Sequence, residues 1–110
     1  MKKNIKVSGI ANITGGGITE NIPRIIPKHL AADIDLNGWK LPKAFQWLQE
    51  KGKISNEDML RIFNCGIGLA LILPLSEVKS FENLAGKYKF KTYRIGKIVK
   101  RTQGELTYLN

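Results

Sequence analysis

The sequence predicts an α+β fold, a mixed β-sheet flanked by helices, and two observations lead to this class. Segments typical of strands alternate along the chain with segments of helical spacing, the pattern of a sheet covered by helices. The 110 residues are 43% hydrophobic and 25% charged, which is ordinary for a globular protein with one core. We therefore expect one domain, neither a multidomain enzyme nor a disordered chain.

The first strand is predicted over residues 7–14, a largely apolar segment that runs into three consecutive glycines. Isoleucines at helical spacing predict a helix over residues 18–26. Its first turn contains Glu20, whose carboxylate complements the helix dipole. Pro23 and Pro27 keep this helix short, because proline removes a backbone donor.

Residues 31–36 form the second predicted strand, which an Asn-Gly turn closes. Pro42 suits the first turn of a helix that ends near Gly52. Aromatic residues on the apolar sides of the short helices are expected in the core. They are Trp39, Phe45, Trp47, Phe63 and Phe81.

The third predicted helix begins at Ser55 and continues to Asn64. The Ser55 hydroxyl can cap the helix, and Asp58 can reach back from the third helical position. Ile54 can pack on Met59 as a hydrophobic staple. This start is predicted from local chemistry alone.

The nearly continuous apolar run over residues 66–73 predicts a central strand buried on both faces, which Pro74 ends. A fourth helix is predicted over residues 76–86, with apolar residues spaced for one buried side and Gly86 as its stop. The last strands are predicted over residues 89–99 and 105–109.

The basic residues exceed the acidic ones by 18 to 9, a formal charge of +9, and they are densest over residues 87–101. In a strand, Lys87, Lys89 and Lys91 would share one face. Such a face suits phosphates, but lysines are also common on solvated faces and on edge strands. Because no nucleic-acid-binding motif accompanies the cluster, we favour the solvated face and do not expect nucleic acid as a partner.

The sequence favours the cytoplasm and no membrane anchor. The longest apolar run, residues 67–74, is shorter than the about 20 residues that span a bilayer. No secretory signal peptide is predicted. Cys65 is the only cysteine and His29 the only histidine, so neither a disulfide nor a metal site is expected.

The first candidate binding segment is residues 13–24, which contains the three glycines. Glycines let backbone N–H groups approach a ligand closely, and the predicted helix start adds further donors. This combination suits a phosphate, although a flexible strand-to-helix turn explains the glycines equally well. The segment is neither a Walker A loop nor G-x-G-x-x-G. The candidate ligands are Thr14, Gly15, Gly16, Gly17, Asn21 and Arg24.

The second candidate segment is residues 63–68. Gly66 and Gly68 would alternate on a strand and leave one face bare for a ligand or another backbone, and Asn64 could close the site. We expect the amides of residues 15–17 to face a cavity walled by Asn64 and Gly66. Cys65 is expected to be buried and inert, because no base is placed beside it by the pattern.

The runs I-T-G-G-G-x-x-E-N-I-P-R and F-N-C-G-x-G, in this order, resemble the C-terminal domain of aminoimidazole ribonucleotide synthetase, also called phosphoribosylformylglycinamidine cyclo-ligase. The resemblance extends over nearly the whole chain but over only about the last third of the family's length. It implies that residues 1–110 are a single partial domain and that the N-terminal ATP-binding domain is absent. It also implies substrate contacts for the glycine loop and for Asn64, Gly66 and Gly68.

In this family ATP and Mg²⁺ serve the ring closure of formylglycinamidine ribonucleotide to aminoimidazole ribonucleotide in cytoplasmic purine biosynthesis. The resemblance implies that most ATP and Mg²⁺ ligands lie in the absent domain, that the full-length enzyme is a homodimer, and that this chain alone is inactive. It assigns no catalytic residue here. Family members usually have histidine where this chain has Asn12, which cannot titrate near neutrality.

Two other functions stay open from the residues. One is a free-standing phosphate- or nucleic-acid-binding module that uses the glycine loop. The other is a degenerate or truncated product that keeps part of the fold without activity.

Overall fold

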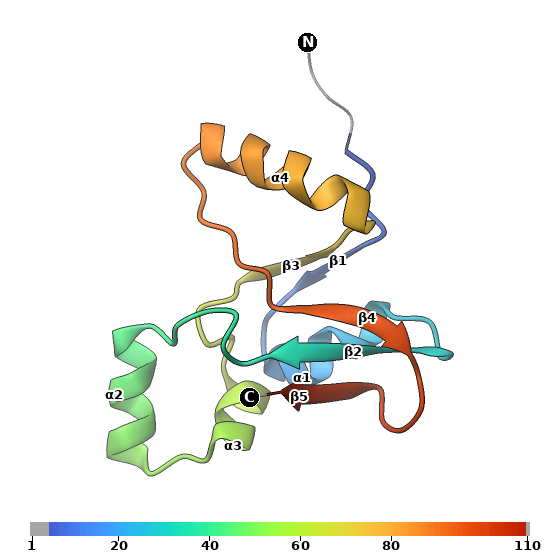
Figure 1. Cartoon of the computed structure of the whole chain (residues 1–110). Helices are drawn as coiled ribbons and strands as arrows, with labels where there is room; N and C mark the ends of the chain where they lie inside the picture. The colour runs from blue at the N-terminus through green and yellow to red at the C-terminus, as the bar shows by residue number, and fades with distance from the viewer. Residues whose placement is uncertain (1–4, 110) are drawn as a thin grey trace.

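The computed structural model describes residues 5–109, which form five strands, four α-helices and one 3₁₀ helix (Figure 1). The elements in chain order are β1 (Gly9–Asn12), α1 (Gly17–Asn21), η1 (Pro23–Ile25), β2 (Leu30–Asp35), α2 (Lys43–Gly52), α3 (Asn56–Ile62), β3 (Leu69–Ile72), α4 (Leu75–Lys87), β4 (Gly96–Lys100) and β5 (Leu106–Leu109).

The described strands form two sheets. In the larger one β2 lies in the middle, antiparallel to β4 and parallel to β5. β1 and β3 form a separate antiparallel pair, in which Asn12 lies opposite Leu69. The α+β class with a mixed sheet is therefore confirmed, but the strands are divided between two sheets.

The prediction of a central strand over residues 66–73 is wrong. Among the described residues the strand begins only at Leu69 and pairs with β1 alone. Gly66 and Gly68 precede it instead of alternating along it. The Leu69 side chain is 53% exposed. An apolar run cannot distinguish a central strand from an edge strand, because distant segments decide what lies beside it.

The main core lies between the three-stranded sheet and the helices α1 and α3. Figure 1 shows α1 behind this sheet, whereas α4 lies beyond the β1–β3 pair. Because β1, α1 and α3 share this core, it places the two glycine-containing segments next to each other. The buried residues of the core are Ala11, Ile13, Ile18, Ile22, Ala32, Ile34, Met59, Leu60, Cys65, Ile67 and Ala70.

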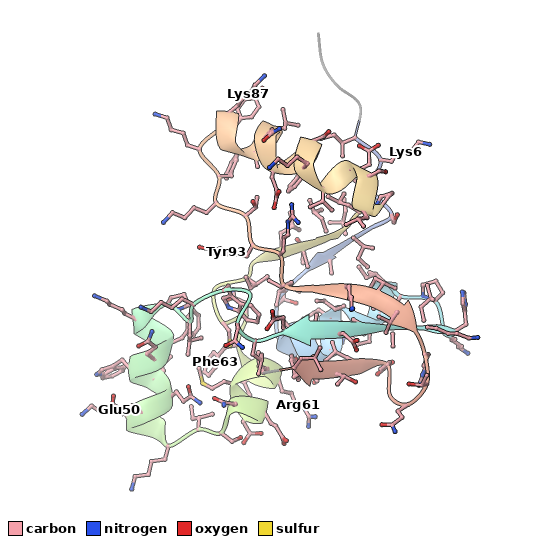
Figure 2. All side chains as sticks on the ribbon, in the orientation of Figure 1. Lys6, Glu50, Arg61, Phe63, Lys87 and Tyr93 are labelled. Carbon is pink, nitrogen blue, oxygen red and sulfur yellow. The ribbon has the colours of Figure 1, made fainter. Side chains whose placement is uncertain are left out.

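The start of α3 is confirmed. The Ser55 hydroxyl accepts a hydrogen bond from the Asp58 backbone N–H at 3.1 Å, and Met59 is buried. On α2, the Phe45 ring contacts the Phe63 ring with centroids 5.9 Å apart, and Figure 2 shows Phe63 near α3 on the side of α2. Placing Trp47 in the core is wrong, because it lies two residues from Phe45 on the helix, faces away and is 60% exposed.

The predicted strand over residues 89–99 is also wrong in its first half. The helix α4 continues through Gly86 to Lys87, and β4 starts only at Gly96. Lys89, with φ 62°, ends the helix in a Schellman motif: its N–H donates to Gly86 O at 3.0 Å, and the Phe90 N–H donates to Ala85 O at 3.0 Å. The lysines of this region therefore do not share a strand face.

The predicted helix over residues 18–26 is split into two short helices. α1 ends at Asn21, and η1 begins at Pro23. Proline at the first position of η1 fits its missing donor.

Candidate functional site

The glycine loop, residues 14–17, turns the chain from β1 into α1. Gly16 and Gly17 both have left-handed backbone conformations, with φ of 97° and 60°. The Gly17 N–H donates to Thr14 O at 2.9 Å and closes the turn. Two successive left-handed residues explain why glycine occupies these two positions.

Gly17 brings the start of α1 against the end of α3. A Cβ on Gly17 would overlap the backbone oxygen of Leu60 and would lie 2.6 Å from that of Phe63. No side chain fits in this space. The glycine loop is therefore held directly against the end of α3 and the first residue of the second candidate segment.

Asn21 holds the loop in shape. Its side chain is only 7% exposed, and its Nδ2 donates to Gly17 O at 2.8 Å. The same atom lies 3.4 Å from Thr14 O and from Gly15 O. The amide donors of Asn21 point into the loop, which gives this residue a positioning role there.

The second segment forms a tight turn over residues 64–67. The Ile67 N–H donates to Asn64 O at 2.9 Å, and the Gly66 N–H donates to Asn64 Oδ1 at 2.8 Å. Cys65 and Gly66, the two central residues, have φ of 54° and 93°, as a type I′ turn requires. A Cβ on Gly66 would also lie 2.6 Å from Pro42 Cγ. Both Asn64 and Gly66 thus shape this turn.

Cys65 is buried, as expected. Its Sγ donates to Met59 O at 3.3 Å, and burial raises the pKa of the thiol. The Cys65 carbonyl accepts a hydrogen bond from Trp39 Nε1 at 3.1 Å. A thiol that is protonated and inaccessible is a poor nucleophile.

The two segments meet where β1 ends and β3 begins. The Ile13 N–H donates to Gly68 O at 3.0 Å, one step beyond the pair of Asn12 and Leu69. Gly15 and Gly68 are both exposed, and a Cβ on either would meet no atom within 4 Å. The backbone at these two glycines is therefore open to a ligand.

Arg24 lies elsewhere. It pairs with Glu20 at 3.8 Å and lines a polar hollow of about 420 Å³ with Arg61 and Glu105. Glu20 also covers Gly16, because its Oε1 lies 3.0 Å from the position of a Cβ there. A carboxylate therefore stands beside the loop.

A second, apolar hollow of about 730 Å³ is lined by Gly66 and Gly68, by residues of β2, β3, β4 and α4, and by the segment between α4 and β4. The three glycines of the loop line neither hollow. The prediction that the amides of residues 15–17 face a cavity walled by Asn64 and Gly66 is therefore wrong. Of the three glycines only Gly15 is exposed, since Glu20 covers Gly16 and Gly17 is buried with its N–H bonded to Thr14 O.

One contact near the site could not be predicted from the sequence motifs. The hydroxyl groups of Thr19 and Tyr108 lie 2.6 Å apart, 89 residues apart in the sequence. Burial raises the pKa of the Tyr108 phenol. The alternation of Leu106 and Tyr108 in the last strand indicates an inward-facing ring, but not its partner.

Residues 5–109 offer neither a metal-binding cluster nor a membrane-spanning helix. They contain no group of three His, Cys, Asp or Glu side chains placed to hold a metal ion. In the same residues, no helix has the length and apolarity needed to cross a membrane.

Comparison with known proteins gives one family and many relatives. Residues 1–109 match the family model described as AIR synthase related protein, C-terminal domain. A phosphoribosylformylglycinamidine cyclo-ligase of Neisseria meningitidis serogroup C (strain FAM18) is 43% identical over 99 residues, which are 90% of this chain and 28% of that protein. The enzymes of the same name from Methylobacillus flagellatus and Lawsonia intracellularis are 44% and 41% identical, over 92% and 94% of this chain and 29% and 30% of their own length.

The chain thus spans less than a third of these relatives, within their C-terminal part. The family model covers all but one of its residues, and the two glycine-containing segments that carried the resemblance are in contact in the structure. This chain therefore belongs to the AIR synthase related proteins, as a C-terminal domain of that ligase family.

Proposed function

We propose that this chain supplies the C-terminal part of a phosphoribosylformylglycinamidine cyclo-ligase. The reaction is the ATP-dependent closure of formylglycinamidine ribonucleotide to aminoimidazole ribonucleotide in purine biosynthesis. The observation that carries the proposal is the meeting of the two family motifs through the hydrogen bond from Ile13 N–H to Gly68 O. Relatives at 41–44% identity carry the name of this enzyme.

In this proposal the phosphate and ribose of the substrate lie along the open backbone between Gly15 and Gly68. Both positions leave room for a ligand at the main chain, and Thr14 is exposed beside them. Closely approached backbone N–H groups are suited to phosphate oxygens. Asn21 and Asn64 contribute by holding the two turns that present this surface.

Arg24 has a different role in this proposal. Its guanidinium stands in the polar hollow beside Glu20, so it reaches a bound anion only by leaving that pair. We assign it to the outer edge of the substrate site.

ATP and Mg²⁺ belong to the complete active site in this proposal. The carboxylate near the glycine loop is Glu20, and the described residues hold no cluster of three possible metal ligands. We therefore assign the Mg²⁺ ligands, and most contacts to ATP, to the part of the relatives that this chain does not cover. The proposal includes a cytoplasmic location, a homodimer of the complete enzyme and no turnover by this chain alone.

The test is reconstitution with the remaining part of the Neisseria meningitidis enzyme. Formation of aminoimidazole ribonucleotide and ADP is measured for the chain alone and for the mixture. Gly15→Val and Gly68→Val place a side chain on the proposed ligand surface, at positions where a Cβ meets no atom within 4 Å. Gly86→Val is the matched control, because it also lies in open space but on α4.

We expect turnover in the mixture only, reduced at least tenfold by either site variant and unchanged by the control. Equal activity of all three variants would refute the assignment of the substrate surface. If the chain instead binds RNA with a steep loss of affinity at high salt, and no mixture turns over, the free-standing module is the better description.

A further inference from the structure

The apolar hollow of about 730 Å³ lies between two sheets and α4. Its lining includes every residue from 66 to 73 and every residue from 90 to 98. Successive residues of a strand point to opposite faces, so a hollow over one face would be lined by alternate residues. Ala32 and Ile34 line the hollow in this alternate way on β2, whereas all of β3 and the first three residues of β4 line it continuously. The hollow therefore lies over one face of β2 and runs along the edges of β3 and β4.

Both strands are edge strands among the described residues. β3 pairs only with β1, and β4 is an outer strand of the larger sheet. The edge of a strand presents N–H and C=O groups that can pair with another strand. Two such edges border the same space here.

Exposed apolar side chains surround this space. Large ones are among the lining residues, and they come from β3, α4 and the segment between α4 and β4, where Figure 2 shows Tyr93. A contiguous apolar patch of this kind is uncommon on a protein that stands alone. The exposed lining residues are Leu69, Leu75, Leu84, Tyr88, Phe90 and Tyr93.

The charged lining residues restrict the occupant. They are Lys91, Arg94 and Lys97 against Glu82, and Glu82 is held by Arg94 at 2.7 and 2.8 Å. A second copy would bring another +9 to this basic rim, which opposes self-association. An occupant with carboxylates beside its apolar residues complements the rim.

We propose that this hollow is filled by a strand-forming segment from the part of a cyclo-ligase polypeptide that this chain does not cover. That part is more than two thirds of each relative compared above. The segment pairs with β3 or β4, buries alternate apolar residues under α4 and carries acidic residues toward Lys91 and Lys97. The inference rests on the proposed function for the identity of the partner.

The experiment measures binding of the full 110-residue chain to the remaining part of the Neisseria meningitidis enzyme, together with amide hydrogen exchange. Phe90→Asp places a carboxylate on a side chain of the hollow that is 71% exposed. Trp47→Asp is the matched control, since Trp47 is 60% exposed on α2 and lies outside the hollow. Circular dichroism checks that both variants keep the fold.

We expect new exchange protection in β3 and β4, at least tenfold weaker binding for Phe90→Asp, and less than twofold change for Trp47→Asp. Absence of binding, protection confined to other elements, or equal binding by both variants would overturn the inference. A dimer of the chain alone that Phe90→Asp dissociates, or an RNA oligonucleotide that protects β3 and β4, would also overturn it.

The two proposals fail separately. Protection of β3 and β4 without any ring closure refutes the proposed function and keeps this docking site. Ring closure that Phe90→Asp leaves unchanged, with equal binding, refutes the docking site and keeps the proposed function.

Discussion

Gly17→Ala tests the contact that joins the two glycine-containing segments. Alanine at φ 60° costs about 1–2 kcal/mol, because its Cβ crowds the following carbonyl in the left-handed region. The new methyl group would also overlap the Leu60 oxygen and lie 2.6 Å from the Phe63 oxygen. Forcing α1 and α3 apart adds about 1–3 kcal/mol, the typical cost of overpacking.

The expected loss is therefore about 2–5 kcal/mol, the sum of these two contributions. Single domains are typically stable by only about 5–15 kcal/mol, so this variant should approach unfolding. Gly15→Ala is the matched control, because Gly15 is outside the left-handed region and its Cβ would meet open space. We expect Gly15→Ala to be neutral or stabilising by up to about 1 kcal/mol.

Urea unfolding, followed by circular dichroism, measures both variants. If Gly17→Ala and Gly15→Ala differ by less than about 1 kcal/mol, a value below the smallest loss worked out above, the close approach of α1 to α3 is incorrect. The proposed substrate surface would then lose its structural basis as well.

Three further predictions concern the same chain. Asn21→Ala removes the donor to the Gly17 carbonyl and should cost about 1–3 kcal/mol in urea unfolding, with faster amide exchange in the glycine loop. Cys65 should react with iodoacetamide much more slowly in the folded chain than in urea, because burial raises the pKa of its thiol. The hydrogen bond from Arg94 lowers the pKa of the Glu82 carboxyl group. The stabilisation by this hydrogen bond is therefore fully present above the ordinary carboxyl pKa and is lost as the pH falls through the lowered pKa. Arg94→Gln should raise the Glu82 pKa in an NMR titration, and an unchanged value would contradict this bond.

Local chemistry made part of the fold and site predictable. The Ser55 hydroxyl caps α3 as predicted, by accepting a hydrogen bond from the backbone N–H of Asp58 three residues later. The burial of Cys65 and the α+β class also follow from composition and spacing. The resemblance to the family came from two short runs of residues taken together, and the structure places left-handed glycines in both of them.

Other features depend on segments that are distant in the sequence, and no local pattern encodes them. One local feature also differs from the prediction: Lys89, three residues after Gly86, adopts the left-handed conformation and ends α4 with Schellman hydrogen bonds. The edge position of β3 and the contact of Thr19 with Tyr108 arise only when separate segments pack together. The sequence therefore predicts some hydrogen bonds between residues a few positions apart. Which strands become neighbours, and which surfaces stay open, depends on the distant residues that the core brings together.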